Sequence, residues 1–214
     1  MSKKVIIAEK PSVAQEFAKV LKVNGNRKNG YIESQDYIVT WCVGHLVTMS
    51  YPESYDEKLK FWRYDTLPFI PKEWKYEVIK NVQAQFDVIK SILNREDVDT
   101  IYVCTDSGRE GEYIYRLVDA MAGVSGKEKK RVWIDSQTEE EILRGVKEAK
   151  DLSYYDSLAD SAYLRAKEDY LIGINFSRLL TLSYGKKVAS MNGEEKTSIS
   201  IGRVMTCVLR HGCR

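Results

Sequence analysis

Continuous apolar runs alternate with amphipathic stretches along the first 150 residues of the chain. The runs at 4–8, 100–105 and 131–134 are short and rich in β-branched or aromatic residues, which is typical of strands buried on both faces of a parallel sheet. A segment with helical spacing of apolar residues follows each run. Repeated strand–helix units of this kind predict a doubly wound α/β fold.

Residues typical of helix starts precede the helical segments. Ser12 follows the first strand after a proline, and Gln15 is spaced to complete a capping box with it. Thr138 and the three acids after it predict a second capping box. Two more helices are expected over 82–93 and 109–122, where apolar residues recur at helical spacing. These helices would cover the sheet.

Changes of pattern indicate how the rest of the chain is organised. The stretch 31–49 has the residues of a strand pair, and 51–75 contains three of the four prolines, which predicts an ordered loop or insertion. From 156 to 182 the sequence has no proline and a helical pattern. We therefore expect one complete domain over 1–150 and the incomplete beginning of a mainly helical domain over 151–214.

Composition excludes some classes of protein. The chain is 43% hydrophobic and 30% charged, and no apolar run approaches the roughly 20 residues that span a bilayer, so no membrane partner is expected. The N-terminal apolar run is too short for a secretion signal. Single cysteines without zinc-finger or disulfide spacing favour the cytoplasm; they are Cys42, Cys104, Cys207 and Cys213. A net charge of +2 means that any DNA binding must come from local patches.

Acidic residues follow two of the predicted strands. Glu9 and Lys10 come after the first strand, and Asp106 and Glu110 come after a later one. Ligands of open α/β sheets bind at the carboxyl ends of strands, so carboxylates from both loops could supply the oxygen ligands of Mg²⁺. Glu112 would lie about 200° around the helix from Glu110, so only one of the two is expected to join the site. Glu112 is the one expected to cap the helix or to support the ligands.

A purely structural interpretation of these residues stays open at this point. Acids near the start of a helix favour its dipole, and Glu9 with Lys10 could form a solvated turn. Gly108 and Gly111 favour a functional loop, because glycine permits unusual backbone angles or close approach to an anion. His45 could be catalytic, but a lone histidine after a strand is more often structural.

Six segments of the chain carry a distinctive combination of motifs. They are V-I-I-A-E-K-P-S-V-A (5–14), G-H-L (44–46), Tyr51 to Trp74, T-D-S-G-R-E-G-E-Y-I (105–114), L-R-A-K-E-D-Y-L-I-G-I-N-F-S-R (164–178) and S-I-G-R-V-M-T (200–206). In this order they resemble the motifs of type IA DNA topoisomerases, specifically of the topoisomerase III branch. The two acidic segments resemble the motifs of that family's Toprim domain.

The resemblance implies a Toprim domain with a Rossmann-like α/β fold, followed by the start of a mainly helical topoisomerase domain. It implies an ATP-independent enzyme that cleaves and rejoins one DNA strand through a 5′-phosphotyrosine intermediate and so changes DNA topology. Single-stranded DNA is the expected partner of a monomeric protein, and Mg²⁺ is the expected cofactor, with Mn²⁺ as an alternative. The sequence has no phosphate-binding loop of the Walker type, in keeping with independence from ATP.

Carried over to this sequence, the resemblance makes Glu9 the catalytic acid near the scissile phosphate and Lys10 a cation beside that phosphate. Asp106 and Glu110 would bind Mg²⁺, with Glu9 as a further ligand. Many relatives have Asp-x-Asp-x-Glu, whereas Gly108 stands at the middle acidic position here. The metal affinity would then be lower, or Glu9 would fill the gap.

The resemblance also assigns part of a single-stranded DNA groove to the later segments. The expected DNA-binding residues are Arg165, Asp169, Asn175, Arg178, Ser200, Gly202 and Arg203. Arginine suits this role because it can donate two hydrogen bonds to one phosphate. An exposed helix face with an Arg165–Asp169 ion pair is the alternative. Met205 replaces the glutamine that is usual in the family.

The nucleophilic tyrosine of the reaction is not found among these 214 residues. In the family it lies downstream in a Tyr-Pro-Arg context, and the only Tyr-Pro here, Tyr51-Pro52, is followed by Glu53. We therefore expect this chain alone to be inactive in DNA cleavage. Two alternatives stay open: a non-catalytic module that binds single-stranded nucleic acid, and another Toprim enzyme such as a primase or nuclease. The helical 164–206 region, which primases and nucleases lack, argues against the second.

Overall fold

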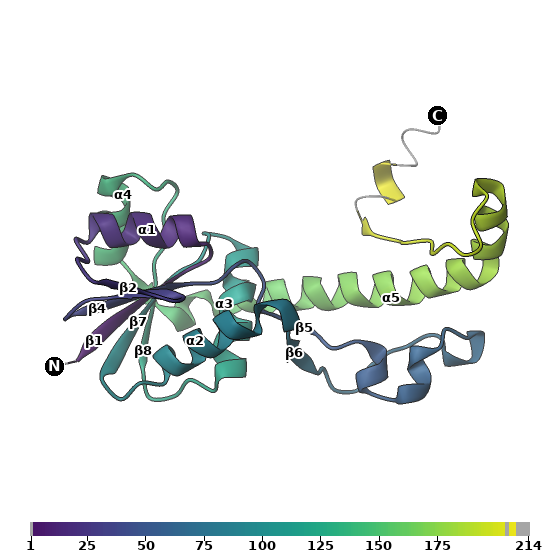
Figure 1. The fold of residues 1–214 in the computed structure, drawn as a ribbon, viewed down its shortest axis with the longest axis horizontal. Coiled ribbons are helices and arrows are strands. Elements are labelled where there is room, and N and C mark those ends of the chain that lie inside the picture. Colours follow the sequence, from purple (N-terminus) through teal and green to yellow (C-terminus); the bar gives the residue numbers. More distant parts are fainter. Residues whose placement is uncertain (1, 204–205, 209–214) are drawn as a thin grey trace. The chain divides into compact units, whose positions relative to one another are not determined.

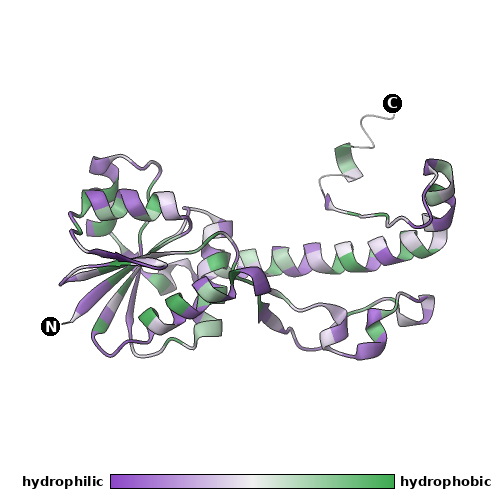
Figure 2. Ribbon diagram, in the orientation of Figure 1, coloured by the Kyte–Doolittle hydropathy of each residue, from purple (hydrophilic) through white to green (hydrophobic). Residues whose placement is uncertain are grey.

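The computed structural model of the chain describes residues 2–203 and 206–208 (Figure 1). Met205 and Cys213 lie outside these residues. No described helix is both long enough and apolar enough to cross a membrane. The longest described helix, α5 (Asp156–Asn192), is not apolar enough, because hydrophobic and hydrophilic residues are mixed along its whole ribbon (Figure 2).

The described residues form two compact units. The first comprises residues 2–49 and 76–162, and the second comprises 50–75 and the described residues after 162. Helix α5 begins in the first unit and ends in the second. The domain division expected at residue 150 stays a prediction.

A seven-stranded sheet forms the centre of the first unit, in the order β2-β3-β4-β1-β7-β8-β9. Its four inner strands run parallel: β4 (Tyr37–Trp41), β1 (Lys3–Ala8), β7 (Val98–Cys104) and β8 (Glu128–Arg131). Antiparallel strands extend it at both edges: β2 (Asn26–Lys28), β3 (Tyr31–Glu33) and β9 (Lys150–Asp151). The apolar runs at 4–8 and 100–105 therefore form neighbouring central strands.

Helices cover both faces of this sheet (Figure 1). One face carries α1 (Pro11–Val20) and α4 (Glu139–Lys147), and the other carries α2 (Gln83–Leu93) and α3 (Arg109–Ala122). Alternate residues of a strand point to opposite faces, so Ile6 packs in the core with Phe17 of α1, whereas the fully buried Ile7 faces the α2–α3 layer. The doubly wound α/β fold predicted from the sequence is confirmed.

The prediction of a strand at 131–134 is wrong in position, because the strand lies at Glu128–Arg131. Strand β8 is polar and ends at Arg131, and the apolar residues lie just beyond it. Val132 still donates its N–H to the carbonyl of Val103 at 3.0 Å, and it packs with Ile134 in the core that includes α1 and α4. The apolar pattern here therefore reflects burial against the helices rather than membership of the strand.

Neither predicted capping box forms. The N-cap of α1 is Lys10, so Ser12 lies inside the first turn, and no side chain caps this helix. Thr138 is the N-cap of α4, as expected, but its side chain makes no capping hydrogen bond. Glu141 instead accepts a hydrogen bond from a backbone N–H that precedes the helix, at 3.1 Å.

The proline-rich stretch 50–75 belongs to the second unit and forms short 3₁₀ helices. They are η1 (Pro52–Ser54), η2 (Glu57–Lys60) and η3 (Tyr64–Thr66). This agrees with the predicted insertion. In the first unit, the strand pair expected over 31–49 is β3 with β4, and a further antiparallel pair joins β5 (Val47–Met49) to β6 (Tyr76–Val78). The first unit also contains η4 (Lys80–Val82) and η5 (Leu152–Tyr155).

Candidate functional site

Two loops that carry acids start at the carboxyl ends of neighbouring strands. β1 pairs in parallel with β7, and Ala8 lies opposite Cys104 at the end of the ladder. Glu9 follows the first strand and Asp106 lies in the loop after the second, so the topology brings their loops side by side. The N–H of Asp106 donates a hydrogen bond to Oε2 of Glu9 at 3.2 Å. The structure therefore brings these two predicted acids together.

Glu9 is a buried carboxyl group, with 6% of the residue exposed. Burial raises the pKa of Glu9 above its ordinary 4.5, and the charges of Asp106 and, more weakly, Glu110 add to the rise. The hydrogen bond from the Asp106 N–H and the charge of Lys10 oppose it. A raised pKa favours the protonated state, in which a carboxylic acid can donate a proton. Glu9 therefore has the surroundings of a general acid.

Lys10 has its ammonium group between the two acids. Nζ lies 3.8 Å from Oε1 of Glu9 and 3.6 Å from Oδ2 of Asp106. The side chains of Lys10 and Asp106 are 54% and 52% exposed, so a ligand from solvent can reach both. The two carboxylates thus converge on one positive charge at a point that is open to water.

Glu110 lies on the first turn of α3 and contacts His45. Its Oε1 is 2.5 Å from Nε2 of His45, and the glutamate side chain is 72% exposed. The ring of His45 also meets the ring of Tyr113 edge-on, with 6.0 Å between their centroids. His45, expected to be structural, therefore contacts a predicted metal ligand.

The three predicted metal ligands are not assembled into one group. Within residues 2–203 and 206–208, no three Asp, Glu, His or Cys side chains lie close enough together to hold a metal ion. Glu9 and Asp106 share the charge of Lys10, whereas Glu110 lies against a histidine. A metal site made of Glu9, Asp106 and Glu110 therefore stays a prediction, and its formation would draw Glu110 away from that histidine.

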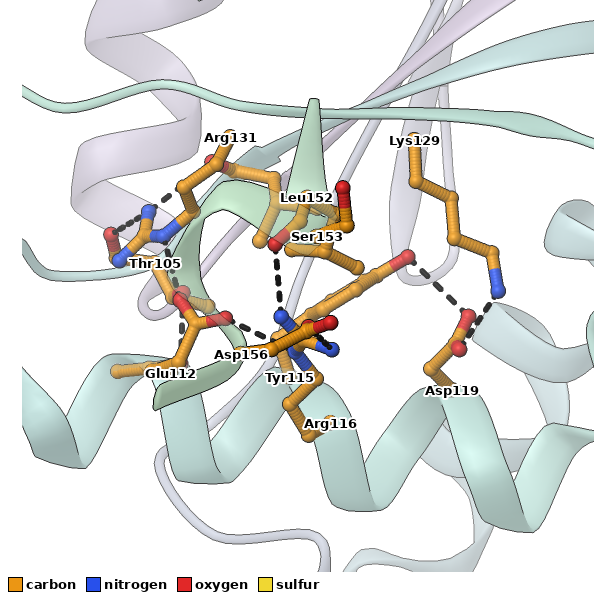
Figure 3. Close-up of polar contacts among 12 residues, drawn as sticks. Thr105, Glu112, Tyr115, Arg116, Asp119, Lys129, Arg131, Leu152, Ser153 and Asp156 are labelled. Atoms are coloured by element: carbon orange, nitrogen blue, oxygen red, sulfur yellow. Dashed lines mark hydrogen bonds and ion pairs between the residues drawn. The ribbon is translucent and has the colours of Figure 1, made fainter. Parts of the chain in front are cut away.

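Glu112 is fully buried and does not cap helix α3. Its Oε2 accepts a hydrogen bond from Nε of Arg131 at 2.8 Å, and its Oε1 accepts one from Nε of Arg116 at 2.9 Å (Figure 3). Arg116 also pairs with Asp156 at 2.8 Å. Glu110 and Glu112 thus have different surroundings, as their helical spacing predicts, and Glu112 is an interior anion held by two arginines.

Gly111 lets helix α3 approach the loop of Asp106 closely. A Cβ atom at this glycine would lie 2.1 Å from the carbonyl oxygen of Asp106, nearer than atoms can pack. Thr105 fastens the same contact, because its Oγ1 donates to the carbonyl of Gly111 at 2.8 Å in the interior. The sequence predicts that a glycine here allows either unusual backbone angles or close approach to an anion. Gly111 does allow a close approach, but what approaches is the loop of Asp106 and not an anion.

Gly108 is under no such constraint. Its backbone is extended, with φ 171° and ψ 178°, and nothing lies within 4 Å of a Cβ built on it. Any residue can adopt this conformation, so the expectation of unusual backbone angles at Gly108 is wrong. A side chain would fit at this position.

A pocket of about 330 Å³ opens beside Asp106, at the carboxyl ends of β7 and β8. Its polar lining residues are Thr105, Asp106, Ser107, Asp135, Ser136 and Gln137. Oγ of Ser107 accepts a hydrogen bond from the N–H of Ile134 at 3.0 Å, which ties the loop after β7 to the segment after β8. The volume is in the range of small-ligand sites.

In the second unit, Asn175 and Arg178 hold the proline-rich stretch on α5. Asn175 binds both backbone groups of Phe69: its Oδ1 accepts from the N–H at 2.6 Å and its Nδ2 donates to the carbonyl at 2.9 Å. Arg178 donates from Nη1 to the carbonyl of Leu59 at 2.8 Å and lies over the ring of Trp62. Only 3% of Arg178 is exposed, and burial lowers its pKa. DNA binding by these two residues stays a prediction.

The other five predicted DNA-binding residues are exposed or partly exposed to solvent. Asp169 pairs with Arg203 at 3.2 Å, and the described residues show no ion pair between Asp169 and Arg165. The ion pair expected in the alternative interpretation is therefore not formed in the described part of the chain, although both residues do lie on helix α5. Ser200 and Arg203 are exposed, and Gly202 is partly exposed. Contact of these residues with DNA stays a prediction.

Arg131 is the residue of the site region that sequence reasoning missed. It is fully buried and its charge is paired with Glu112. The available signal is an arginine at the edge of an apolar run, since arginine is almost never fully buried unless a carboxylate pairs with it. Sequence alone does not indicate which acid that partner is.

Comparisons with known proteins agree with one another. The Toprim domain family matches residues 4–136. DNA topoisomerase 3 of Bacillus subtilis (strain 168) is 42% identical over 209 residues, which are 98% of this chain and 27% of that protein. DNA topoisomerase 3 of Bacillus cereus (strain ATCC 10987 / NRS 248) is 46% identical over 188 residues, which are 88% of this chain and 26% of that protein. The chain spans about a quarter of the length of these relatives.

Gly111→Ala is expected to destabilise the fold by about 1–3 kcal/mol, because its methyl group would force α3 away from the Asp106 loop. Gly173→Ala is the matched control. This glycine of α5 has only an ordinary contact at 3.8 Å, and alanine favours a helix by up to about 1 kcal/mol. Urea unfolding of the three proteins measures both effects. Equal stability of Gly111→Ala and the wild type would contradict the close approach.

Glu9→Gln is expected to stabilise the protein at neutral pH. Burial raises the folded-state pKa of Glu9, so the folded state keeps this proton to a higher pH than the unfolded state, whose pKa is near 4.5. Wild-type stability therefore falls as the pH rises from 4.5 through the folded pKa, and glutamine removes that fall. The free energy of unfolding, measured across this window, checks the sign. A variant that loses stability with pH as the wild type does would rule out this effect.

Proposed function

The chain belongs to the Toprim domain family, and from this premise we propose that it is the amino-terminal portion of an ATP-independent type IA DNA topoisomerase of the topoisomerase III branch. Such an enzyme cleaves one DNA strand, passes another through the gap and reseals the first. The observation that carries the proposal is the convergence of Glu9, Lys10 and Asp106 at the carboxyl ends of β1 and β7. The relatives named DNA topoisomerase 3, which align with nearly the whole chain, support it.

Strand cleavage needs a general acid and a cation, and in this proposal Glu9 and Lys10 would supply them. A tyrosine oxygen bonds to phosphorus, the bond from phosphorus to the 3′ oxygen breaks, and the tyrosine proton passes to solvent. Glu9, whose pKa is raised by burial, would donate a proton to the leaving 3′ oxygen and recover it on resealing. Lys10 would offset the charge on the phosphate oxygens. The phosphotyrosine bond keeps the energy for rejoining, so no ATP is needed.

We also propose Mg²⁺ as the cofactor of these acids, with Mn²⁺ as an alternative. Asp106 and Glu110 would hold the ion, with Glu9 as a further ligand while its carboxyl group is deprotonated, since hard cations prefer oxygen ligands. Two of these carboxylates already converge on the positive charge of Lys10, and the half-exposed side chain of Asp106 leaves room for the water molecules that Mg²⁺ retains. A bound ion would stabilise negative charge on the phosphate.

The nucleophilic tyrosine would lie outside these 214 residues. The chain contains no Tyr-Pro-Arg, and the relatives extend well beyond the aligned region, which is 27% of one of them. Single-stranded DNA would be bound in part by the second unit, where Ser200 and Arg203 are exposed. We also propose a monomer that works in the cytoplasm, in keeping with the free thiols of Cys42 and Cys104.

A covalent-adduct assay tests the proposal. In a chimera, this chain replaces the matching part of Bacillus subtilis DNA topoisomerase 3, and the protein is incubated with end-labelled single-stranded DNA and Mg²⁺. A protein–DNA band after denaturation is expected for the chimera and not for the 214-residue chain. Asp106→Asn in the chimera should weaken the band, whereas Glu139→Gln, which removes an exposed acid of α4, should not.

Three results would contradict the proposal. An adduct with the 214-residue chain alone would mean that one of its own tyrosines is the nucleophile. Cleavage that depends on Asp106 but leaves no covalent band would indicate a nuclease. Binding of single-stranded DNA without cleavage by the chimera would favour a non-catalytic module.

Gly108→Asp is expected to strengthen Mg²⁺ binding. The position has space for a side chain, and a new carboxylate near a divalent ion in water contributes about 2 kcal/mol, or more than tenfold in affinity. Gly108→Asn is the matched control, because it has the same shape without the charge. Calorimetric titration with Mg²⁺ compares the two variants. Equal affinities in the two variants would show that no metal ion binds next to residue 108.

A further inference from the structure

Arg131 at the end of β8 is one of the largest fully buried side chains of the described chain (Figure 3). Its Nε donates to Oε2 of Glu112 at 2.8 Å, and neither side chain has any exposed surface. A buried charge is costly unless it is paired and its hydrogen-bonding groups are satisfied. The other hydrogen bonds of this guanidinium therefore indicate its role in the structure.

The remaining donors of Arg131 bind four backbone carbonyls, two of which belong to the loop that carries Asp106. Nη2 donates to the carbonyl of Asp106 at 2.8 Å. Nη1 donates to the carbonyls of Val103 (3.0 Å), Thr105 (2.8 Å) and Val132 (2.9 Å). The guanidinium thus joins the end of β7 and the first two residues of the loop to a fixed point on the neighbouring strand.

Asp106 is held on both sides of its Cα atom as a result. Its carbonyl accepts from Arg131, and its N–H donates to Glu9. The carboxylate itself is half exposed, so its direction depends on the backbone beneath it. Arg131 and Glu9 each hold that backbone from one side.

Glu112 in turn fixes the guanidinium. One oxygen of its carboxylate binds Arg131 and the other binds Arg116. Arg116 donates to the carbonyl of Leu152 at 2.8 Å and pairs with Asp156, and in the described structure it makes no hydrogen bond to the loop of Asp106. Two arginines therefore share Glu112, and only one of them reaches the site.

We propose that Arg131, oriented by Glu112, is a positioning residue that aims the Asp106 carboxylate at the metal ion and the DNA phosphate. The role in metal binding rests on the proposed function. Lysine cannot replace Arg131 here, because its three N–H donors radiate from one nitrogen, whereas arginine has five in a rigid plane that reach several acceptors at once.

Arg131→Lys and Arg116→Lys in the 214-residue chain form a matched test. Both remove a guanidinium from Glu112 and keep a positive charge, but only the first changes the loop of Asp106. Mn²⁺ affinity, measured by electron paramagnetic resonance, is expected to fall roughly 10–100-fold in Arg131→Lys and to stay near the wild-type value in Arg116→Lys. The Asp106 amide signal in ¹⁵N NMR should shift and exchange faster with solvent only in Arg131→Lys.

A double variant, Glu112→Gln with Arg131→Met, guards against a failure to fold. It removes both buried charges together, which proteins often tolerate, and it should give the same two changes as Arg131→Lys. Equal loss of Mn²⁺ affinity in Arg116→Lys and Arg131→Lys would overturn the proposal, because it would reflect general destabilisation. An unchanged Asp106 amide in both Arg131 variants would overturn it too. If the wild type binds no Mn²⁺, the proposed metal site fails, and the amide measurement alone decides whether Arg131 positions the loop.

Discussion

Parallel pairing of β1 with β7 determines where the acids of the candidate site can lie. Parallel strands end at the same edge of a sheet, so Glu9 after one strand and Asp106 after the next meet although 97 positions separate them. β8 continues the parallel ladder and ends at Arg131, which adds a cation beneath the same edge. Three neighbouring strand ends thus supply an acid, a predicted metal ligand and the support of that ligand.

The residues of this edge are arranged at a cost to stability. Glu9 is a carboxyl group whose charged form is disfavoured by burial, and the pair of Glu112 and Arg131 is an ionic contact with no exposed surface. Gly111 favours a helix less than alanine would, but its lack of a side chain lets α3 approach the loop of Asp106. Conflicts of this kind gather at functional sites, where geometry matters more than local stability.

Much of the fold could be predicted from the sequence because its signals are local. The buried strands at 4–8 and 100–105 and the helices after them follow from short-range periodicity, and the same pattern puts Glu9 and Asp106 at strand ends. The pairing of Glu112 with Arg131 could not be predicted, because it depends on which strand lies beside β7. The sequence pattern predicts the third strand too far along the chain for a similar reason. Val132 is apolar because it packs against helices, and it lies just beyond the end of β8.

A titration with Mn²⁺, followed by NMR, tests most directly whether these strand ends form a cation site. Paramagnetic broadening is predicted to appear first at the amides of Glu9, Lys10 and residues 106–110, and Asp106→Asn should remove it. Broadening that appears first at the acids of 139–141, or no broadening at all, would contradict a cation site at the ends of β1 and β7.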